Sequence, residues 1–184
     1  MSDAAPRILM VIAPKDFRDE ELLVPRTAFQ AVGWPVDTVS TQTGTAIGML
    51  GATETITQTL DTVDPTEYRA VVVVGGMGSI EYLWHNKTLH SILNVINTQG
   101  GVIAGICLSA AVPALAGLAK GKQLTVYETP ESVAAIVNNG GIYTNEAVTV
   151  DGRLITANGP EAAEAFANAL VVALQPVIVP VAAG

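Results

Sequence analysis

Short continuous apolar runs recur along the chain. The three clearest are Arg7–Ala13, Tyr68–Val74 and Val102–Ile106. Runs of this length without a polar interruption are typical of strands that are buried on both faces of a parallel sheet. Weaker patterns predict two further strands, Pro35–Ser40 and Gln123–Tyr127.

Between these runs, apolar residues follow the spacing of helices. Acidic residues occupy the first turn of the segment that begins at Asp19, where the positive end of the helix dipole favours them. Pro25 lies inside that segment and predicts either a kink or a later helix start. The expected helices are Asp19–Val32, Leu108–Leu118, Pro130–Asn138 and Pro160–Leu174, with one or two more in Ser79–Gln99.

Turn-forming residues mark the connections between these elements. Pro14–Arg18 is a polar break after the first strand. Thr41–Asp64 is rich in Thr and Gly and predicts a loop with a short hairpin. Asp151-Gly152 is a strong two-residue hairpin signal, and it predicts that Ala147–Val150 and Arg153–Thr156 pair with each other.

The alternation of strands and helices predicts the fold class. Parallel strands need crossover connections, so the simplest arrangement is a three-layer α/β/α sandwich with a mostly parallel central sheet. We find no internal repeat and no linker, and therefore interpret residues 1–184 as one domain with a core at about residues 7–174. The apolar tail, residues 175–184, is expected to pack on the domain or at a dimer contact.

Composition and charge narrow the classes of partner. Hydrophobic residues make up 49% and charged residues 14% of the 184 residues, which is the profile of a folded chain. A formal net charge of −8 argues against nucleic acid, because binding to phosphates depends on Lys and Arg. No signal peptide and no apolar run of about 18 residues is visible, so no membrane contact is expected. With a single cysteine and no disulfide, a cytoplasmic location is expected.

Three chemical features follow the predicted strands, at the sheet edge where open parallel sheets bind ligands. They are Glu21, the pair Gly75-Gly76 and Cys107. A thiol at a helix N-terminus is favoured as thiolate by the dipole, and the Leu108 and Gly76 N–H groups are candidate oxyanion donors. The Glu21 carboxyl is a candidate proton donor or acceptor for the sulfur.

Each feature also has a purely structural interpretation. A lone cysteine such as Cys107 is often a small buried apolar residue. A glutamate in the first turn of a helix, such as Glu21, is usually a solvated charge that interacts with the helix dipole. The glycine pair lacks the spacing of a phosphate-binding loop and fits a simple strand-to-helix turn. His85 and His90 are interpreted as surface residues, and no ligand cluster supports a metal or another cofactor.

Several motifs follow one another along the chain: Asp16–Leu22 with Pro25, Val71–Gly76 and Ala104–Cys107, with weaker support from Asn139–Tyr143, Asp151-Gly152 and Gly159-Pro160. Together they resemble the ThiJ/PfpI superfamily, which includes PfpI-type intracellular proteases and the parkinsonism-associated deglycase. The resemblance covers about Arg7 to Leu174. It implies a flavodoxin-like, glutamine-amidotransferase-like fold, a homodimer, a hydrogen bond between Glu21 and Cys107, and a thiol that is readily oxidised.

The chain also departs from that family. Members known as peptidases have histidine directly after the cysteine, where this chain has Leu108, so a Cys-His pair with that neighbour is excluded. Where the deglycase branch carries a histidine, this chain has Tyr127 and Glu128, which we expect to line the pocket together with Gly75. Ser109 is expected either to cap the helix start or to line the same pocket.

The resemblance implies three kinds of function. The first is a cofactor-free enzyme of glyoxalase, deglycase or isonitrile-hydrating type, in which Cys107 acts on small molecules such as methylglyoxal-type aldehydes in stress defence. The second is a redox-sensing or chaperone-like dimer without turnover, and the third is an inactive scaffold that acts through its dimer surface. A peptidase is disfavoured by Leu108.

Overall fold

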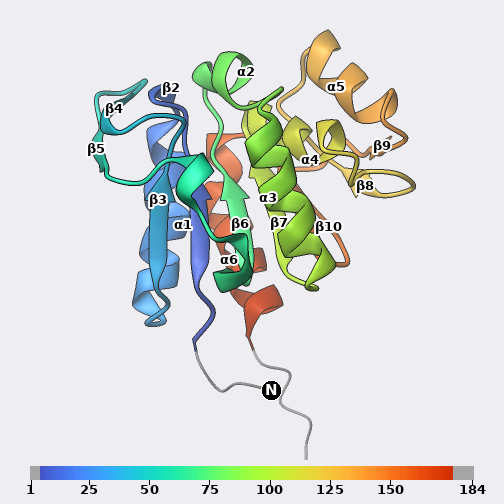
Figure 1. Ribbon diagram of the computed structural model, residues 1–184. Coiled ribbons are helices and arrows are strands. Elements are labelled where there is room, and N and C mark those ends of the chain that lie inside the picture. The colour runs from blue at the N-terminus through green and yellow to red at the C-terminus, as the bar shows by residue number, and fades with distance from the viewer. Residues whose placement is uncertain (1–4, 176–184) are drawn as a thin grey trace, which may run out of the picture.

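The computed structural model describes residues 5–175 and is built around a six-stranded sheet (Figure 1). The strand order is β10-β11-β7-β6-β1-β3, and every neighbouring pair is parallel except the pair β10 and β11. This confirms the mostly parallel central sheet. The strands are β1 (Ile8–Val11), β3 (Val36–Val39), β6 (Ala70–Val73), β7 (Val102–Ile106), β10 (Val148–Asp151) and β11 (Leu154–Ala157).

The continuous apolar runs form the middle of this sheet. Every residue of β1, β6, β7 and β11 is buried, whereas the edge strand β3 is only half-buried. A strand that is covered on both faces has no solvent side, so its sequence carries no polar alternation. The core consists largely of Val, Ile, Leu and Ala side chains from these strands and from the helices and connections that pack on them.

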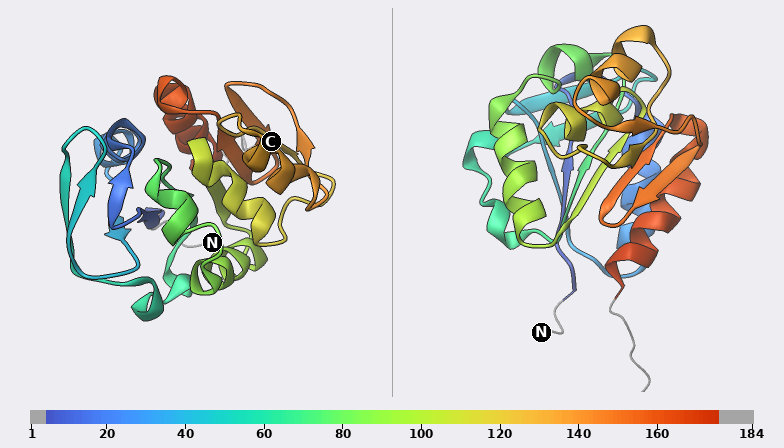
Figure 2. Two further views of the ribbon diagram at one scale, coloured as in Figure 1. Left: turned by 90° about the horizontal axis from the view of Figure 1, so that it is seen from above. Right: turned by 90° about the vertical axis from the view of Figure 1, so that its right-hand side faces the viewer.

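Helices cover both faces of the sheet and make the three predicted layers (Figure 2). Helices α1 and α6 pack against each other on one face, while α3 packs against β6 and β7 on the other. The short helices α2, α4 and α5 lie toward the carboxyl ends of the strands (Figure 1). The bounds are α1 (Asp19–Ala31), α2 (Gly78–Tyr82), α3 (Lys87–Thr98), α4 (Val112–Leu115), α5 (Pro130–Val137) and α6 (Ala163–Leu174).

The first helix and the segment before it differ from the sequence prediction. Helix α1 begins at Asp19 and continues through Pro25, so the later start is wrong. The polar break contains a strand, β2 (Lys15–Phe17), which has a single buried apolar side chain, Phe17. Three residues are too few to show a period in the sequence.

Strand β2 belongs to a small second sheet that includes the predicted hairpin. Strands β4 (Gly44–Gly48) and β5 (Thr53–Ile56) are antiparallel, which confirms the hairpin, and β2 pairs with β4 in parallel. The buried Asp19 carboxylate accepts hydrogen bonds from the Leu50 N–H at 2.9 Å and the Ala52 N–H at 2.7 Å. The start of α1 therefore fixes the hairpin turn.

Two predictions for the second half of the chain are only partly right. The helix expected from Leu108 to Leu118 is a 3₁₀ segment, η3 (Cys107–Ala111), followed by the single turn of α4. The strand expected at Gln123–Tyr127 is only β8 (Gln123–Leu124), which pairs with the unexpected strand β9 (Ile142–Tyr143) outside the central sheet. Both segments are apolar because η3 and the residues after β8 are buried beside the central sheet, so their composition does not reveal their geometry.

The β10–β11 hairpin confirms the second hairpin prediction, with a shift of one residue. Asp151 pairs with Leu154, so Gly152 and Arg153 form the two-residue connection. Gly152 has a φ of +63°, in the left-handed region that this turn requires. The last helix is preceded by a 3₁₀ turn, η4 (Pro160–Ala162).

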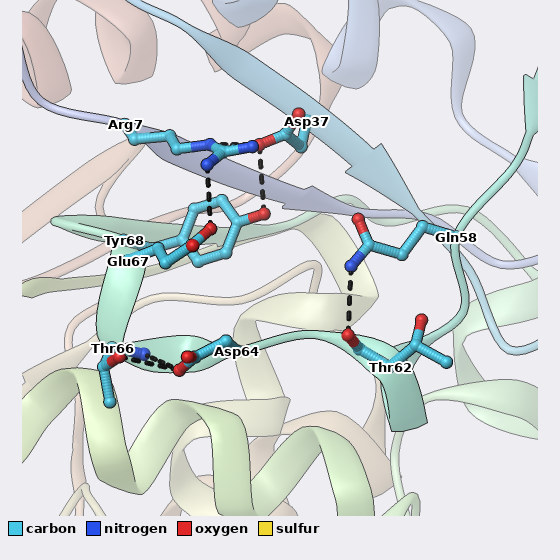
Figure 3. Close-up of polar contacts among 8 residues, drawn as sticks. All are labelled: Arg7, Asp37, Gln58, Thr62, Asp64, Thr66, Glu67 and Tyr68. Carbon is cyan, nitrogen blue, oxygen red and sulfur yellow. Dashed lines mark hydrogen bonds and ion pairs between the residues drawn. The ribbon is translucent and has the colours of Figure 1, made fainter.

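A polar cluster ties together the amino-terminal ends of β1, β3 and β6 (Figure 3). The Arg7 guanidinium donates to Asp37 at 2.7 Å and to Glu67 at 2.8 Å, and it lies over the Tyr68 ring. The Tyr68 hydroxyl also donates to Asp37, at 3.0 Å. The positive charge of Arg7 pairs with both carboxylates at the edge opposite the carboxyl ends of the strands, so we interpret this cluster as structural.

No helix within residues 5–175 is long and apolar enough to cross a membrane. The expected packing of the apolar tail concerns residues that, apart from Gln175, lie outside the described part of the chain.

Candidate functional site

Cys107 lies at a sharp turn directly after β7. Its φ is +58°, in the left-handed region that side chains other than glycine rarely adopt. The turn brings the chain back so tightly that a Cβ on Gly105 would lie 2.6 Å from the Ser109 carbonyl oxygen. Such backbone strain is of order 1–3 kcal/mol and is concentrated at functional sites. The predicted elbow is confirmed, with a cysteine that is 7% exposed.

Glu21 lies in the first turn of α1 and is completely buried. One carboxyl oxygen, Oε2, accepts a hydrogen bond from the Gly75 N–H at 3.0 Å. The other, Oε1, has no hydrogen-bond partner among residues 5–175. Burial raises the pKa of Glu21 to about 8, against smaller lowering effects of the Cys107 thiol and the Gly75 N–H. The carboxyl is therefore protonated at neutral pH, and it is not a solvated charge.

Gly75 separates the carboxyl from the thiol. A Cβ at this position would lie 2.5 Å from Glu21 Oε2 and 2.6 Å from Cys107 Cβ, so any side chain would displace one of the two groups. The structure thus brings together Glu21, Gly75 and Cys107 from three elements. A direct hydrogen bond between the carboxyl and the sulfur stays a prediction.

The pKa of the thiol is shifted in the direction opposite to the sequence expectation. Burial, and next the charge of an ionised Glu21, raise the pKa of Cys107 to about 12. The dipole contributes little, because η3 is a 3₁₀ segment and α4 has only four residues. Two adjacent buried anions repel each other, so the pair keeps at least one proton, and the Glu21 contribution to the thiol pKa disappears when its carboxyl is protonated. The thiolate thus requires a protonated Glu21.

Two backbone N–H donors partly offset the increase in the thiol pKa that burial causes. The N–H groups of Gly76 and Leu108 both lower the pKa of Cys107. Leu108 directly follows Cys107, and Gly76 directly follows Gly75, whose Cβ position is 2.6 Å from Cys107 Cβ, so both donors lie near the thiol. These are the two donors that the sequence suggested for an oxyanion, and that role stays a prediction. Gly76 has a φ of +105°, and a Cβ there would lie 2.5 Å from the Arg18 nitrogen.

Arg18 is a residue near the site that sequence reasoning missed. Its N–H donates to the Gly75 carbonyl at 2.9 Å, and its guanidinium holds Glu20 through two hydrogen bonds of 2.8 and 3.0 Å. Its positive charge lowers the pKa of Glu21. The available signal was its place inside the first-helix motif, three residues before Glu21.

Ser109 supports the elbow from inside the protein. Its hydroxyl donates to the Val74 carbonyl at 2.7 Å and is completely buried, so it caps no helix. On the same segment, the Trp84 indole N–H donates to the Leu108 carbonyl at 2.9 Å. Both contacts fix the backbone that directly follows the Leu108 N–H.

Tyr127 and Glu128 lie on the opposite side of Cys107 from Glu21. The Tyr127 N–H donates to the Cys107 carbonyl at 3.2 Å. Both residues line a surface hollow of about 430 Å³, together with Asn145, Asn158 and other residues of the same edge.

The two histidines lie elsewhere. His85 is exposed, and His90 Nε2 is 2.8 Å from the Trp84 carbonyl oxygen on the segment before α3. In the described part of the chain, no group of three or more His, Cys, Asp or Glu side chains gathers in a way that would hold a metal ion.

Comparisons with known proteins find relatives that match most of this chain. The model of the DJ-1/PfpI family matches residues 6–173. The chain is 45% identical over 169 residues to an uncharacterized protein of Methanocaldococcus jannaschii, covering 92% of this chain and 82% of that protein. It is 28% identical over 152 residues to a deglycase of Pyrococcus horikoshii, covering 83% and 90% of the two chains. The crystal structure of a ThiJ/PfpI domain protein from Brachyspira murdochii is 30% identical, with a TM-score of 0.86 over 92% of this chain and 96% of that one.

Proposed function

This chain belongs to the DJ-1/PfpI family, and we propose that it is a cofactor-free enzyme that uses Cys107 as a nucleophile on small reactive aldehydes. The observation that carries the proposal is the strained elbow, where a buried thiol lies between two backbone N–H donors and a buried protonated carboxyl. Relatives such as the protein of Pyrococcus horikoshii are named deglycases, which supports aldehyde or aldehyde-adduct chemistry.

The proposed reaction begins when the thiol, which its raised pKa keeps mostly protonated at neutral pH, releases its proton to water while Glu21 stays protonated. The sulfur attacks the aldehyde carbon of a 2-oxoaldehyde, the carbonyl electrons move to oxygen, and the Gly76 and Leu108 N–H groups stabilise that oxygen. Glu21 gives its proton to the oxygen, and then moves the proton from the first carbon to the second. The resulting thioester is hydrolysed by one water molecule, so that methylglyoxal and water give lactate and the free thiol.

A Cys107→Ala variant is expected to form lactate from methylglyoxal only at the uncatalysed rate, a loss on the order of 10²-fold or more. Cys107→Ser keeps the shape of the site and is expected to be equally inactive, because a serine hydroxyl without a strong base is a poor nucleophile. The measurement is lactate release with purified variants, with Ser91→Ala on the exposed side of α3 as the control. Equal rates for wild type and Cys107→Ala would exclude the proposal.

A redox role is a second candidate, and it is favoured by the unpartnered oxygen of Glu21. The Glu21 carboxyl interacts with the thiol, and its protonated form can donate a hydrogen bond to an oxygen atom on the sulfur, since its Oε1 has no other partner among residues 5–175. Two molecules of hydrogen peroxide would convert the thiol to a sulfinic acid and release two molecules of water. The homodimer and the cytoplasmic location that the sequence suggests stay predictions.

Mass spectrometry after mild peroxide treatment tests this second candidate. We expect two oxygen atoms on Cys107 at a dose that leaves Met77 mostly unmodified, although Met77 is 59% exposed. An unchanged Cys107 at doses that fully oxidise Met77 would count against a sensor.

A further inference from the structure

The peptide unit that carries the Gly76 N–H is held at its carbonyl end. That carbonyl belongs to Gly75 and accepts a hydrogen bond from the Arg18 N–H at 2.9 Å. A trans peptide unit is planar, and its C=O and N–H groups point in opposite directions. The bond to Arg18 therefore fixes the direction of the Gly76 N–H, and a reversed unit would turn a carbonyl oxygen toward the side on which that donor now lies.

The neighbouring carbonyl groups of this loop are held as well. The Val74 carbonyl accepts a hydrogen bond from the buried Ser109 hydroxyl at 2.7 Å, and the Gly76 carbonyl accepts one from the buried Ser79 hydroxyl at 2.8 Å. Three consecutive carbonyl groups thus receive donors from η3, from the start of α1 and from α2. Of these three bonds, the one from Arg18 is on the unit that carries the Gly76 N–H.

The peptide unit that carries the Leu108 N–H is held in the same way. Its carbonyl belongs to Cys107 and accepts a hydrogen bond from the Tyr127 N–H at 3.2 Å. The Tyr127 carbonyl in turn accepts one from the Ser132 hydroxyl at 2.6 Å, and Ser132 lies in the first turn of α5. Arg18 and Tyr127 lead into α1 and α5, which are well separated in the molecule (Figure 1), so the two units are held independently.

These two bonds affect the thiol through the N–H group at the far end of each unit. A hydrogen bond to the carbonyl polarises the peptide unit and strengthens its N–H as a donor. Donors that are oriented before a charge develops stabilise an anion in a buried site more than donors that must first turn toward it. Cys107 is only 7% exposed, so little water is available to replace a lost donor.

We propose that Arg18 and Tyr127 are positioning residues that act through their main-chain N–H groups, each fixing the peptide unit that presents a donor to Cys107 and to the oxyanion formed there. The inference rests on the proposed function, because the oxyanion belongs to that reaction. It adds that the start of α1 and the segment before α5 keep the two donors in place. The Arg18 guanidinium and the Tyr127 ring are not needed for this role.

Arg18→Pro tests the first bond, with Arg18→Ala as its matched control. Both variants lose the guanidinium and its pair with Glu20, but only proline lacks the N–H. Arg18 has a φ of −84° and follows the extended strand β2, so its backbone accepts proline. The measurements are lactate release and the rate at which iodoacetamide alkylates Cys107 over the neutral to mildly alkaline pH range.

Replacement of the Tyr127 N–H by an ester oxygen tests the second bond. Incorporation of the α-hydroxy acid of tyrosine at this position keeps the side chain and removes the donor. The same substitution at Tyr68 is the matched control, because the Tyr68 N–H donates to the Pro65 carbonyl at 3.3 Å, far from the thiol. Urea unfolding is expected to show a similar loss of stability for the two esters, since each removes one hydrogen bond of similar length.

Relative to its control, each test variant is expected to be alkylated at least about threefold more slowly at every pH, and to release lactate at least about tenfold more slowly. A thiol with one donor fewer is less often a thiolate, and the higher nucleophilicity of the more basic sulfur offsets this only partly. The direction of the change separates positioning from support of the fold, because a loosened elbow would expose Cys107 and raise the alkylation rate.

Alkylation as fast as in the matched control, for the Tyr127 ester or for Arg18→Pro, would overturn the proposal. If Arg18→Pro does not fold, the comparison of the two esters decides. The outcome does not depend on turnover. Slower alkylation of the test variants in a protein that makes no lactate would refute only the proposed reaction, whereas lactate formation with unchanged alkylation would refute only the positioning role.

Discussion

Glu21→Gln is expected to reduce lactate formation by a factor on the order of 10²–10⁴ while leaving the nucleophilicity of Cys107 nearly intact. Glutamine keeps the size of the protonated carboxyl, accepts the Gly75 hydrogen bond and presents an N–H to the sulfur, so the thiolate keeps a neutral neighbour. It has no proton to transfer, so the proposed steps after the attack fail. The two measurements are lactate release and the rate of alkylation by iodoacetamide.

Glu20→Gln is the matched control, because it makes the same chemical change one residue earlier, on the carboxylate that pairs with Arg18. We expect this control to keep turnover within a fewfold of the wild type. Retention of turnover by Glu21→Gln would contradict the role of Glu21, and loss of alkylation together with turnover would show that glutamine does not replace the protonated acid.

The same variant is expected to change how stability depends on pH. Because the pKa of Glu21 is raised from 4.5 to about 8 by burial, the folded protein binds this proton more tightly than the unfolded chain between those values. Stability from this group is thus fully present below pH 4.5 and is lost as pH rises toward 8, with a slope of at most about 1.4 kcal/mol per pH unit. Urea unfolding across this window should show a fall in the wild type that Glu21→Gln lacks. Parallel profiles would refute the raised pKa.

The sequence predicted those parts of the fold in which a buried strand produces an unbroken run of apolar residues. Strands β1, β6 and β7 are covered on both faces, so their unbroken apolar runs specify both their type and their central position. The hairpin at Gly152 was predictable because its turn needs a left-handed residue. Strands β2 and β9 were not, since two or three residues show no period in the sequence and these strands form only through partners distant in the chain.

The candidate site also has a part that the sequence predicted and a part that it did not. Residue order along the strands was enough to expect Glu21, the glycine pair and Cys107 at one edge. The direction of the thiol pKa was not predictable, because it depends on how deeply the sulfur is buried and on the short length of the helix behind it. Of the residues that line the hollow, the sequence analysis indicated only Tyr127 and Glu128. Asn145, Asn158 and Glu161 join it through strand register and loop packing that no local pattern encodes.

Gly76→Ala is expected to damage both stability and the site, because two requirements for glycine coincide there. The φ of +105° by itself disfavours alanine by about 1–2 kcal/mol. In addition, the new Cβ would overlap the Asp16 carbonyl oxygen and lie 2.5 Å from the Arg18 nitrogen, so the segment that leads into α1 has to move. This movement would shift the first turn of α1, which contains Glu21. It would also displace the Gly76 N–H, which is one of the two backbone donors that lower the pKa of the thiol.

Gly51→Ala separates the two effects. Gly51 has a similar φ of +98°, but nothing lies within 4 Å of its Cβ position. We expect urea unfolding to show a loss of about 1–2 kcal/mol for Gly51→Ala and at least about twice that for Gly76→Ala. We expect the alkylation rate of Cys107 and lactate release to fall only in Gly76→Ala. Equal losses of stability and unchanged alkylation in both variants would mean that the close approach of the Asp16–Arg18 segment to Gly76 has no part in holding Glu21 and the N–H donor at the thiol.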